Sequence, residues 1–279
     1  MSSVSDTNAA APPTLPTFTL QDRVVVITGG ASGLGLVMGK GVVESGAHLA
    51  IVDINETQAV LQAGILAENF KEQYPTRPVP RVTAHRVDVS DQDSIAACVK
   101  DIVAVHGKVD HLVTSAGFTE NYAAVDYPVD RMRRLWAVNV DGTYLFACEV
   151  ARHLLARKAG GSMVFIGSMS GAIVNTPQLQ TPYNASKAAV KHLASSLAVE
   201  WAKDGIRVNC ISPGYMATAL TEKILDERPD LKEHWVGGTP MARMGNPEDL
   251  KGPVTFLLSD ASKYVTGAEL RVDGGYTVV

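Results

Sequence analysis

The sequence predicts an α/β fold in which seven parallel strands form one doubly wound sheet within a single domain. Short β-branched runs alternate with longer segments of helical period, which is typical of repeated strand, helix, strand units. No internal repeat, charge block or second Gly/Pro-rich linker divides the 279 residues. We therefore expect one domain over residues 21–279, preceded by a flexible N-terminal arm at 1–20.

The strands are predicted from short apolar runs that are rich in Val and Ile. Continuous apolar runs of this length are typical of parallel strands that are buried on both faces. The candidates are residues 23–28, 48–53, 82–88, 111–114, 161–167, 206–212 and 269–272.

The helices are predicted between these strands, each near a residue that caps or turns the chain. Asp91, Thr181 and Asn246 are examples of such starting residues. The predicted helices are residues 33–45, 56–73, 91–106, 130–157, 182–203 and 247–259.

One segment, residues 215–245, departs from this alternation. It follows a strand, has two stretches of helical character, and is interrupted by Pro229, Gly237, Gly238 and Pro240. Such a segment is expected to be a substrate lid. A surface insertion between a strand and a helix is the alternative, and composition does not separate the two.

Charge and composition favour a small-molecule partner. The formal net charge is -4, and no Lys/Arg block indicates binding to nucleic acid or to a membrane surface. Aromatic residues make up only 6%, whereas glycine occurs 24 times, which favours tight turns over stacking platforms for bases.

The cysteines and the N-terminal segment predict a soluble, cytoplasmic protein. Cys98, Cys148 and Cys210 are odd in number and widely spaced, so they indicate neither a disulfide framework nor a metal site. The first 22 residues contain no Lys or Arg and no apolar core of a secretory signal. Polar residues or glycines interrupt every apolar run before it could span a bilayer.

A glycine-rich turn follows the first strand and opens the first helix. Its sequence is Thr28-Gly29-Gly30-Ala31-Ser32-Gly33-Leu34-Gly35. Gly29 allows a tight turn, Gly33 a close approach of backbone to ligand, and Gly35 close packing of helix on strand. The free N–H groups at the helix N-terminus suit a pyrophosphate, although an isolated match would more often be an ordinary turn.

An acidic residue at the end of the second strand strengthens this interpretation. Asp53 lies 18 residues after Gly35, where a carboxylate can accept hydrogen bonds from an adenosine ribose. Capping of the next helix is the alternative. An ionised Asp53 repels a 2′-phosphate, so NAD is predicted over NADP. Asp88 and Val89, after the third strand, are candidates for the adenine site, with helix capping by Asp88 equally plausible.

A candidate acid/base pair begins a later helix. Tyr183 and Lys187 are four residues apart and therefore share one helix face. A phenol has a pKa near ~10, and a neighbouring ammonium together with an oxidised nicotinamide favours the phenolate. Ser168 ends the fifth strand and is placed to orient a substrate oxygen, and Asn139 to position Lys187 through water. Taken singly, each residue also has a structural explanation.

Taken together, these residues resemble the short-chain dehydrogenase/reductase family from about residue 22 to 279. The resemblance implies a Rossmann-like doubly wound fold and a catalytic tetrad of Asn139, Ser168, Tyr183 and Lys187. It also implies a homotetramer. For the nicotinamide side of the cofactor site it implies Ala116, Gly117, Pro213, Gly214 and Thr218.

The sequence departs from the family pattern at two places. Thr114-Ser115 stands where the family usually has Asn-Asn before Ala-Gly, at a position where the resemblance implies sheet and cofactor contacts. Ser168 lies 15 residues before Tyr183, slightly more than the commonest spacing, so Ser170 is a possible substitute. The strand end at Ile166-Gly167 favours Ser168.

The residues between Ser170 and Tyr183 point to the substrate. Asn175, Gln178 and Gln180 offer three amides for hydroxyl groups, unless they face solvent. The sequence of this stretch resembles that of fungal members of the family that act on polyols and ketoses. An apolar cover formed by Met216, Trp235, Met241 and Met244 would instead suit another alcohol or ketone.

The predicted activity is reversible hydride transfer between NAD(H) and a secondary alcohol or ketone, with a polyol/ketose pair favoured. Ser168, Ser170, Asn175, Gln180 and Tyr183 are the predicted substrate contacts. One alternative is a reductase of acyl or polycyclic ketones, and another is a non-catalytic NAD-sensing protein. Apolar residues on more than one face of the helices at 130–157 and 182–203 predict association with further copies.

Overall fold

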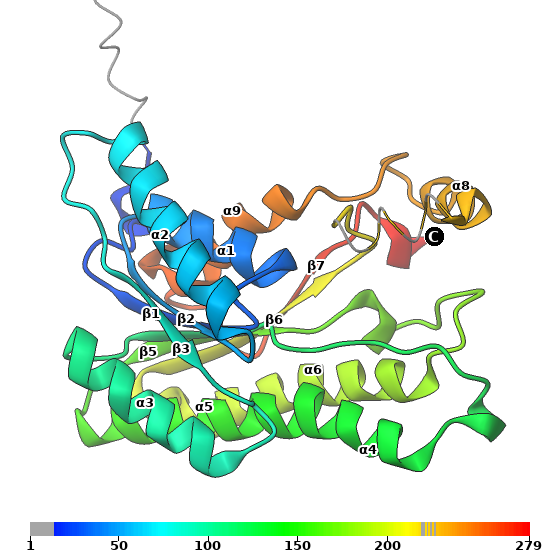
Figure 1. The fold of residues 1–279 in the computed structure, drawn as a ribbon, viewed down its shortest axis with the longest axis horizontal. Helices are drawn as coiled ribbons and strands as arrows, with labels where there is room; N and C mark the ends of the chain where they lie inside the picture. Colours follow the sequence, from blue (N-terminus) through cyan, green and yellow to red (C-terminus); the bar gives the residue numbers. More distant parts are fainter. Residues whose placement is uncertain (1–13, 219–220, 222, 224, 226) are drawn as a thin grey trace, which may run out of the picture.

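The fold is a seven-stranded parallel sheet with helices on both faces (Figure 1). The computed structural model describes residues 14–218, 221, 223, 225 and 227–279. The strand order is β3-β2-β1-β4-β5-β6-β7, which confirms the doubly wound, Rossmann-like prediction. The strands are β1 Val24–Thr28, β2 His48–Asp53, β3 Val82–Arg86, β4 His111–Thr114, β5 Gly161–Ile166, β6 Ile206–Pro213 and β7 Glu269–Val272.

Two helical layers bury the sheet. Helices α1, α2 and α9 cover one face, and α3, α4, α5 and α6 cover the other (Figure 1). A hydrophobic cluster lies on each side, so all five residues of β1 are buried. The helices are α1 Gly33–Glu44, α2 Glu56–Gln73, α3 Gln92–His106, α4 Val129–Trp136, α5 Gly142–Ala156, α6 Thr181–Trp201, α8 Pro229–Gly237 and α9 Lys251–Leu258.

The helix predicted at 130–157 is interrupted, which the sequence pattern did not indicate. Ala137–Asp141 forms a π-helical turn between α4 and α5. Such a turn keeps the helix axis but inserts an extra residue, and it often occurs at functional sites. The apolar periodicity continues through it, so the turn was not visible in the sequence. The other predicted helices end within about one turn of their observed bounds.

The predicted arm and lid are described only in part. Residues 1–13 lie outside the described residues, and from Leu20 onward the chain enters the core, since Leu20 is 1% exposed. Within 215–245, α8 is helical, and residues 219, 220, 222, 224 and 226 lie outside the described residues. Among the described helices, none is both long and apolar enough to cross a membrane.

The strand order positions the site. After β1 the chain crosses to β2, whereas β4 lies on the other side of β1. The connections that leave β1 and β4 therefore run to opposite faces of the sheet, and in doubly wound folds ligands bind at the carboxyl ends of such strands. The glycine turn, the loop after β4 and the loops after β5 and β6 all lie at this edge.

A buried imidazole lies at the opposite end of the strands, where β4 begins. His111 begins β4 and is 6% exposed, and its Nδ1 accepts a hydrogen bond of 3.0 Å from the Ser162 backbone N–H. Burial lowers the pKa of His111 to about 4, with the Arg23 and Arg207 charges acting in the same direction and the Asp110 and Asp260 charges opposing. The folded protein therefore holds this imidazole neutral.

We predict that His111 makes the stability of the protein fall in mild acid. In the unfolded chain the pKa is 6.5, so the unfolded state binds a proton first as the pH falls. The contribution is fully present above pH 6.5 and is lost progressively towards pH 4. Relative to His111→Gln, the wild-type protein should lose about 3 kcal/mol more over this range, measured by urea unfolding at several pH values.

The matched control is His192→Gln on the exposed side of α6, which should follow the wild-type pH dependence. Identical slopes for wild type and His111→Gln between pH 6.5 and 4 would contradict the assignment of this loss to His111.

Candidate active site

The glycine turn is tightly packed at Gly29 and Gly35 and has open space beside Gly33. Gly29 has φ 63°, and a Cβ there would lie 2.8 Å from the Ala116 backbone. A Cβ on Gly35 would lie 2.2 Å from the Gly29 carbonyl oxygen, so α1 packs directly on the turn. Gly33 has φ 54°, and a Cβ there would meet nothing within 4 Å. The turn is closed towards the sheet and open beside Gly33.

The N-terminus of α1 is free to bind an anion. Ser32 is the N-cap residue, but its side chain makes no capping hydrogen bond. The first N–H groups of a helix have no partner within the helix and favour negative charge. A diphosphate fits this donor set, so the residues present fit a dinucleotide.

Asp53 supports the same turn from the end of β2. One carboxylate oxygen accepts from the Ala31 N–H at 3.1 Å, and the other accepts from the Asn55 N–H at 3.0 Å. The N-cap of α2 is Asn55, whose side chain accepts from the Gln58 N–H. The alternative that Asp53 caps α2 is therefore wrong, and its carboxylate lies beside the glycine turn.

Asp88 is likewise not a helix cap. Its carboxylate accepts from both the N–H and the hydroxyl of Ser90, and the Ser90 hydroxyl is the main reason that the pKa of Asp88 is lowered. Asp91 caps α3 instead. The next residue, Val89, is buried. It lies so close to α5 that a Cβ on Gly142 would clash with Val89.

The loop after β4 joins the glycine turn to the candidate catalytic residues. The Ala116 N–H donates to the Thr28 hydroxyl at 3.2 Å. A Cβ on Gly117 would lie 3.1 Å from Asn139 Oδ1 and 3.5 Å from Lys187 Nζ, so these two side chains meet beside Gly117. The Thr114 hydroxyl is buried and has no hydrogen-bond partner among the described residues.

Asn139 lies in the π-helical turn and is 1% exposed. Its amide donates to the Phe118 carbonyl oxygen and to the Ser186 hydroxyl, both at 3.1 Å, and accepts from the Phe118 N–H. The side chain thus ties the loop after β4 to α6. Ser186 was not among the predicted site residues, although its position in Tyr183-Asn184-Ala185-Ser186-Lys187 was a signal.

Tyr183 and Lys187 share one face of α6, as predicted. Lys187 Nζ lies 5.7 Å from the centre of the Tyr183 ring and donates to the Ile166 carbonyl oxygen at 2.8 Å. Burial lowers the pKa of Lys187 to about 8. Burial raises the pKa of Tyr183, opposed by the hydrogen bond with Ser168. In the protein alone, the phenol is therefore protonated.

The two candidate serines have different partners. Ser168 Oγ accepts from the Ser170 N–H at 3.1 Å, and the Ser168 side chain lies close enough to the Tyr183 phenol to lower its pKa. Ser170 is 6% exposed, and its hydroxyl donates to Asn175 Oδ1 at 2.5 Å. The structure therefore places Ser168, rather than Ser170, next to the phenol.

The three amides do not face solvent. Asn175 and Gln180 are 2% and 7% exposed, and Gln178 is half-buried. Gln180 Nε2 lies 3.4 Å from the Ser170 hydroxyl and 3.0 Å from Asn184 Oδ1. Together with Ser170, these amides form a connected set of polar side chains beside Ser168, which we call the amide wall.

The loop after β6 completes the same edge of the sheet. A Cβ on Gly214 would lie 2.7 Å from Asp273 Cα, so this loop packs closely on the end of β7. Pro213 is the last residue of β6, and the Thr218 hydroxyl lies 2.6 Å from that of Thr221. Sequence reasoning did not single out Tyr215, although its place after Pro213-Gly214 put it at this edge.

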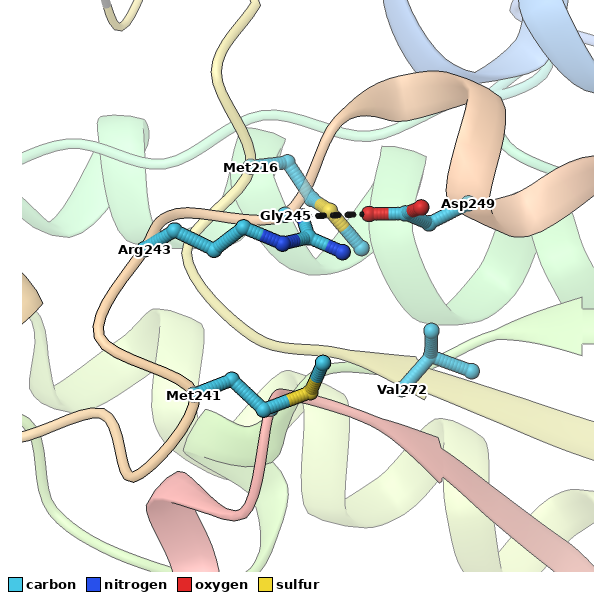
Figure 2. A pocket seen from close by; sticks show the side chains of 7 residues that line it. Met216, Met241, Arg243, Gly245, Asp249 and Val272 are labelled. Carbon is cyan, nitrogen blue, oxygen red and sulfur yellow. Dashed lines mark hydrogen bonds and ion pairs between the residues drawn. The ribbon is translucent and has the colours of Figure 1, made fainter.

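The residues expected to form one apolar cover are divided between two places. Trp235 and Met244 pack with Tyr215, whereas Met216 is buried in the core and Met241 is 62% exposed. Figure 2 shows Met216 and Met241 in a pocket of about 200 Å³, where Arg243 pairs with Asp249 at 2.8 Å. Asn139, Ser168, Tyr183 and Lys187 do not line this pocket. It is separate from the candidate catalytic residues.

A family model described as enoyl-(acyl carrier protein) reductase matches residues 29–277, which include the glycine turn, Tyr183 and Lys187. The chain belongs to the short-chain dehydrogenase/reductase family. A solved structure entitled "Crystal structure of gox2181" aligns with a TM-score of 0.86 and 37% identity, over 94% of this chain and 98% of the other. The family and fold predicted from the sequence are confirmed.

Curated relatives cover nearly the whole chain. A D-arabinitol 2-dehydrogenase (ribulose-forming) of Candida albicans is 42% identical over 94% of this chain and 95% of its own length. An NADH-dependent L-xylulose reductase of Ambrosiozyma monospora is 38% identical over 94% and 98%. An NADP-dependent mannitol dehydrogenase of Hypocrea jecorina is 38% identical over 94% and 95%.

Proposed function

We propose that this protein interconverts a polyol and the matching ketose by hydride transfer with NAD(H). One observation carries the proposal: the candidate acid/base Tyr183 lies next to Ser168, and Ser168 adjoins a wall of buried amides. Fixed donors and acceptors discriminate hydroxyl-rich substrates from apolar ones. The names of the relatives, which act on arabinitol, xylulose and mannitol, support the same substrate class.

Four side chains carry the proposed chemistry. The Tyr183 hydroxyl exchanges a proton with the carbinol or carbonyl oxygen, and the Ser168 hydroxyl orients that oxygen. Lys187 holds a positive charge beside the phenol, and Asn139 ties α6 to the loop after β4. The nicotinamide supplies the hydride acceptor or donor.

Within this proposal, the protein's residues bind the cofactor at the carboxyl ends of the strands. The glycine turn, with Gly29, Ser32, Gly33, Leu34 and Gly35, would hold the diphosphate. Asp53 would accept hydrogen bonds from the adenosine ribose. Asp88, Val89, Ala116, Gly117, Pro213, Gly214 and Thr218 would complete the adenine and nicotinamide sides. Ser170, Asn175 and Gln180 would line the substrate side with Ser168 and Tyr183.

The substrate class is tested with a panel that contains polyols of five and six carbons, acyl thioesters and polycyclic ketones. We expect the highest kcat/KM with NAD and a polyol, because the buried amides match hydroxyl groups. A preference for acyl thioesters or polycyclic ketones would contradict the proposal, and NAD binding without turnover of any compound would indicate a non-catalytic protein.

In the same assay Tyr183→Phe should lower kcat by about 10²- to 10⁴-fold, because the proton exchange is lost. The affinity for NAD, measured by fluorescence titration, should change little. Tyr74→Phe removes a hydroxyl at the C-cap of α2, where the ring packs on Phe70, and is the matched control. Near-normal turnover by Tyr183→Phe would refute the assignment.

We further propose that NAD is preferred over NADP because Asp53 carries a negative charge at the ribose. Asp53→Asn keeps an acceptor oxygen for the backbone but removes the charge. The ratio of kcat/KM for NAD to that for NADP should fall about 10- to 100-fold, as expected from removing one unit charge a few ångströms from a phosphate. Asp91→Asn, at the N-cap of α3, is the control. A wild-type preference for NADP would contradict this role.

A cytoplasmic homotetramer is part of the proposal. Cys98, Cys148 and Cys210 are unpaired, which supports a reducing compartment. Many apolar residues of α5 and α6 pack in the core, but Val199 on α6 and Tyr144 on α5 are 80% and 43% exposed. Light scattering should give about four times the chain mass of 29.7 kDa, and a monomer mass would exclude it.

A further inference from the structure

A chain of hydrogen bonds runs from Ser168, which lies beside the candidate acid/base Tyr183, to α8. The Ser168 hydroxyl accepts from the Ser170 N–H at 3.1 Å. The Ser170 hydroxyl then donates to Asn175 Oδ1 at 2.5 Å. Asn175 Nδ2 donates to the Tyr215 hydroxyl at 3.1 Å, which brings the chain across to the loop after β6.

Gln178 carries the chain from Tyr215 to α8. The amide orientation that satisfies its neighbours places the oxygen 3.0 Å from Trp235 Nε1 and 3.1 Å from the Tyr215 hydroxyl. In this orientation both groups donate to Gln178, and its nitrogen donates to the Thr176 carbonyl oxygen at 3.0 Å. The Tyr215 hydroxyl therefore accepts from one amide and donates to another.

Packing holds Tyr215 in this position. Its ring stacks on that of Trp235, with centroids 4.1 Å apart and an interplanar angle of 8°. The Tyr276 ring meets it edge-on at 5.2 Å, where the C-terminus lies beside α8 (Figure 1). Burial raises the pKa of Tyr215 to about 12, so the hydroxyl keeps its proton at neutral pH.

The Tyr215 hydroxyl satisfies the hydrogen-bonding needs of the buried amides. Asn175 is 2% exposed, so without the Tyr215 hydroxyl its N–H group would be left in the interior with no acceptor. A buried donor without a partner is costly, and the loop would rearrange to satisfy it. Tyr215 thus determines one arrangement of Asn175 and Gln178 relative to Ser168.

We propose that Tyr215 is a positioning residue for substrate selection: it locks the loop 171–180 to α8, so that the amide wall meets the distal hydroxyl groups of the substrate in one fixed geometry. The inference rests on the proposed polyol activity. Tyr215 acts on the part of the substrate beyond the reacting carbon, whereas Tyr183 acts on the reacting oxygen.

The test compares two alcohols that differ in distal hydroxyl groups, arabinitol and 2,3-butanediol. Tyr215→Phe keeps the stacked ring and removes the hydroxyl. It should lower kcat/KM for arabinitol about 10- to 100-fold, mainly through KM, because misplaced buried polar groups reject a hydroxylated substrate. For 2,3-butanediol kcat/KM should change less than about threefold, since this compound makes few of those contacts.

A second variant keeps the inference testable if Tyr215→Phe folds poorly. Gln178→Met changes a half-buried loop residue and breaks the chain at the next link, so it should give the same selective loss for arabinitol. Tyr74→Phe is the matched control for loss of a tyrosine hydroxyl and should leave both substrates unchanged. The melting temperature of Tyr215→Phe should fall because a buried donor loses its partner, whereas that of Tyr74→Phe should stay close to the wild-type value.

Parallel losses for both alcohols, or no loss for arabinitol, would overturn the role of Tyr215 and leave the proposed function standing. A wild-type protein that oxidises 2,3-butanediol but no polyol would overturn both the polyol proposal and the inference that rests on it.

Discussion

The parallel pairing of β4 with β1 is the constraint on which the rest of the site depends. It places Ala116 against Gly29 with no space for a Cβ, and it brings the Thr28 hydroxyl within hydrogen-bond distance of the Ala116 N–H. The glycine turn and the loop after β4 are thus one packed unit at the carboxyl edge of the sheet. From this unit Gly117 leads to Asn139 and Lys187, and the turn leads to the free N-terminus of α1.

Burial decides the charge state of the central residues. Lys187 is buried and Tyr183 is partly buried, and desolvation disfavours the charged form of each, so the pKa of the amine falls and that of the phenol rises. The phenolate expected from the sequence depends on the Lys187 ammonium together with an oxidised nicotinamide, and it stays a prediction for the protein with its cofactor. In the folded protein the desolvation of the phenol is the larger effect, and the Ser168 hydrogen bond opposes it in part.

The substrate side is built from segments that are distant in the chain. Asn175 and Gln178 lie in a loop after β5, Tyr215 follows β6, and Trp235 belongs to α8. The sequence predicted that the amides bind substrate hydroxyl groups, and it allowed Trp235 and three methionines to form one apolar cover. The structure separates them, because Met216 turns into the core whereas Trp235 stacks on Tyr215. Neither contact leaves a periodic or spaced signal in the sequence.

The sequence by itself determined the strands, the glycine turn and the Tyr183/Lys187 pair, because each rests on local properties: apolar periodicity, backbone freedom and spacing on one helix face. It could not decide between Ser168 and Ser170, whether the amides face inward, or whether Asp53 caps α2. Only the tertiary structure decided these questions, since each depends on which distant groups occupy the hydrogen-bonding positions of a side chain. The π-helical turn at Asn139 is likewise decided by the tertiary structure. Hydrogen bonds to α6 and to the loop after β4, rather than local propensity, orient the Asn139 amide.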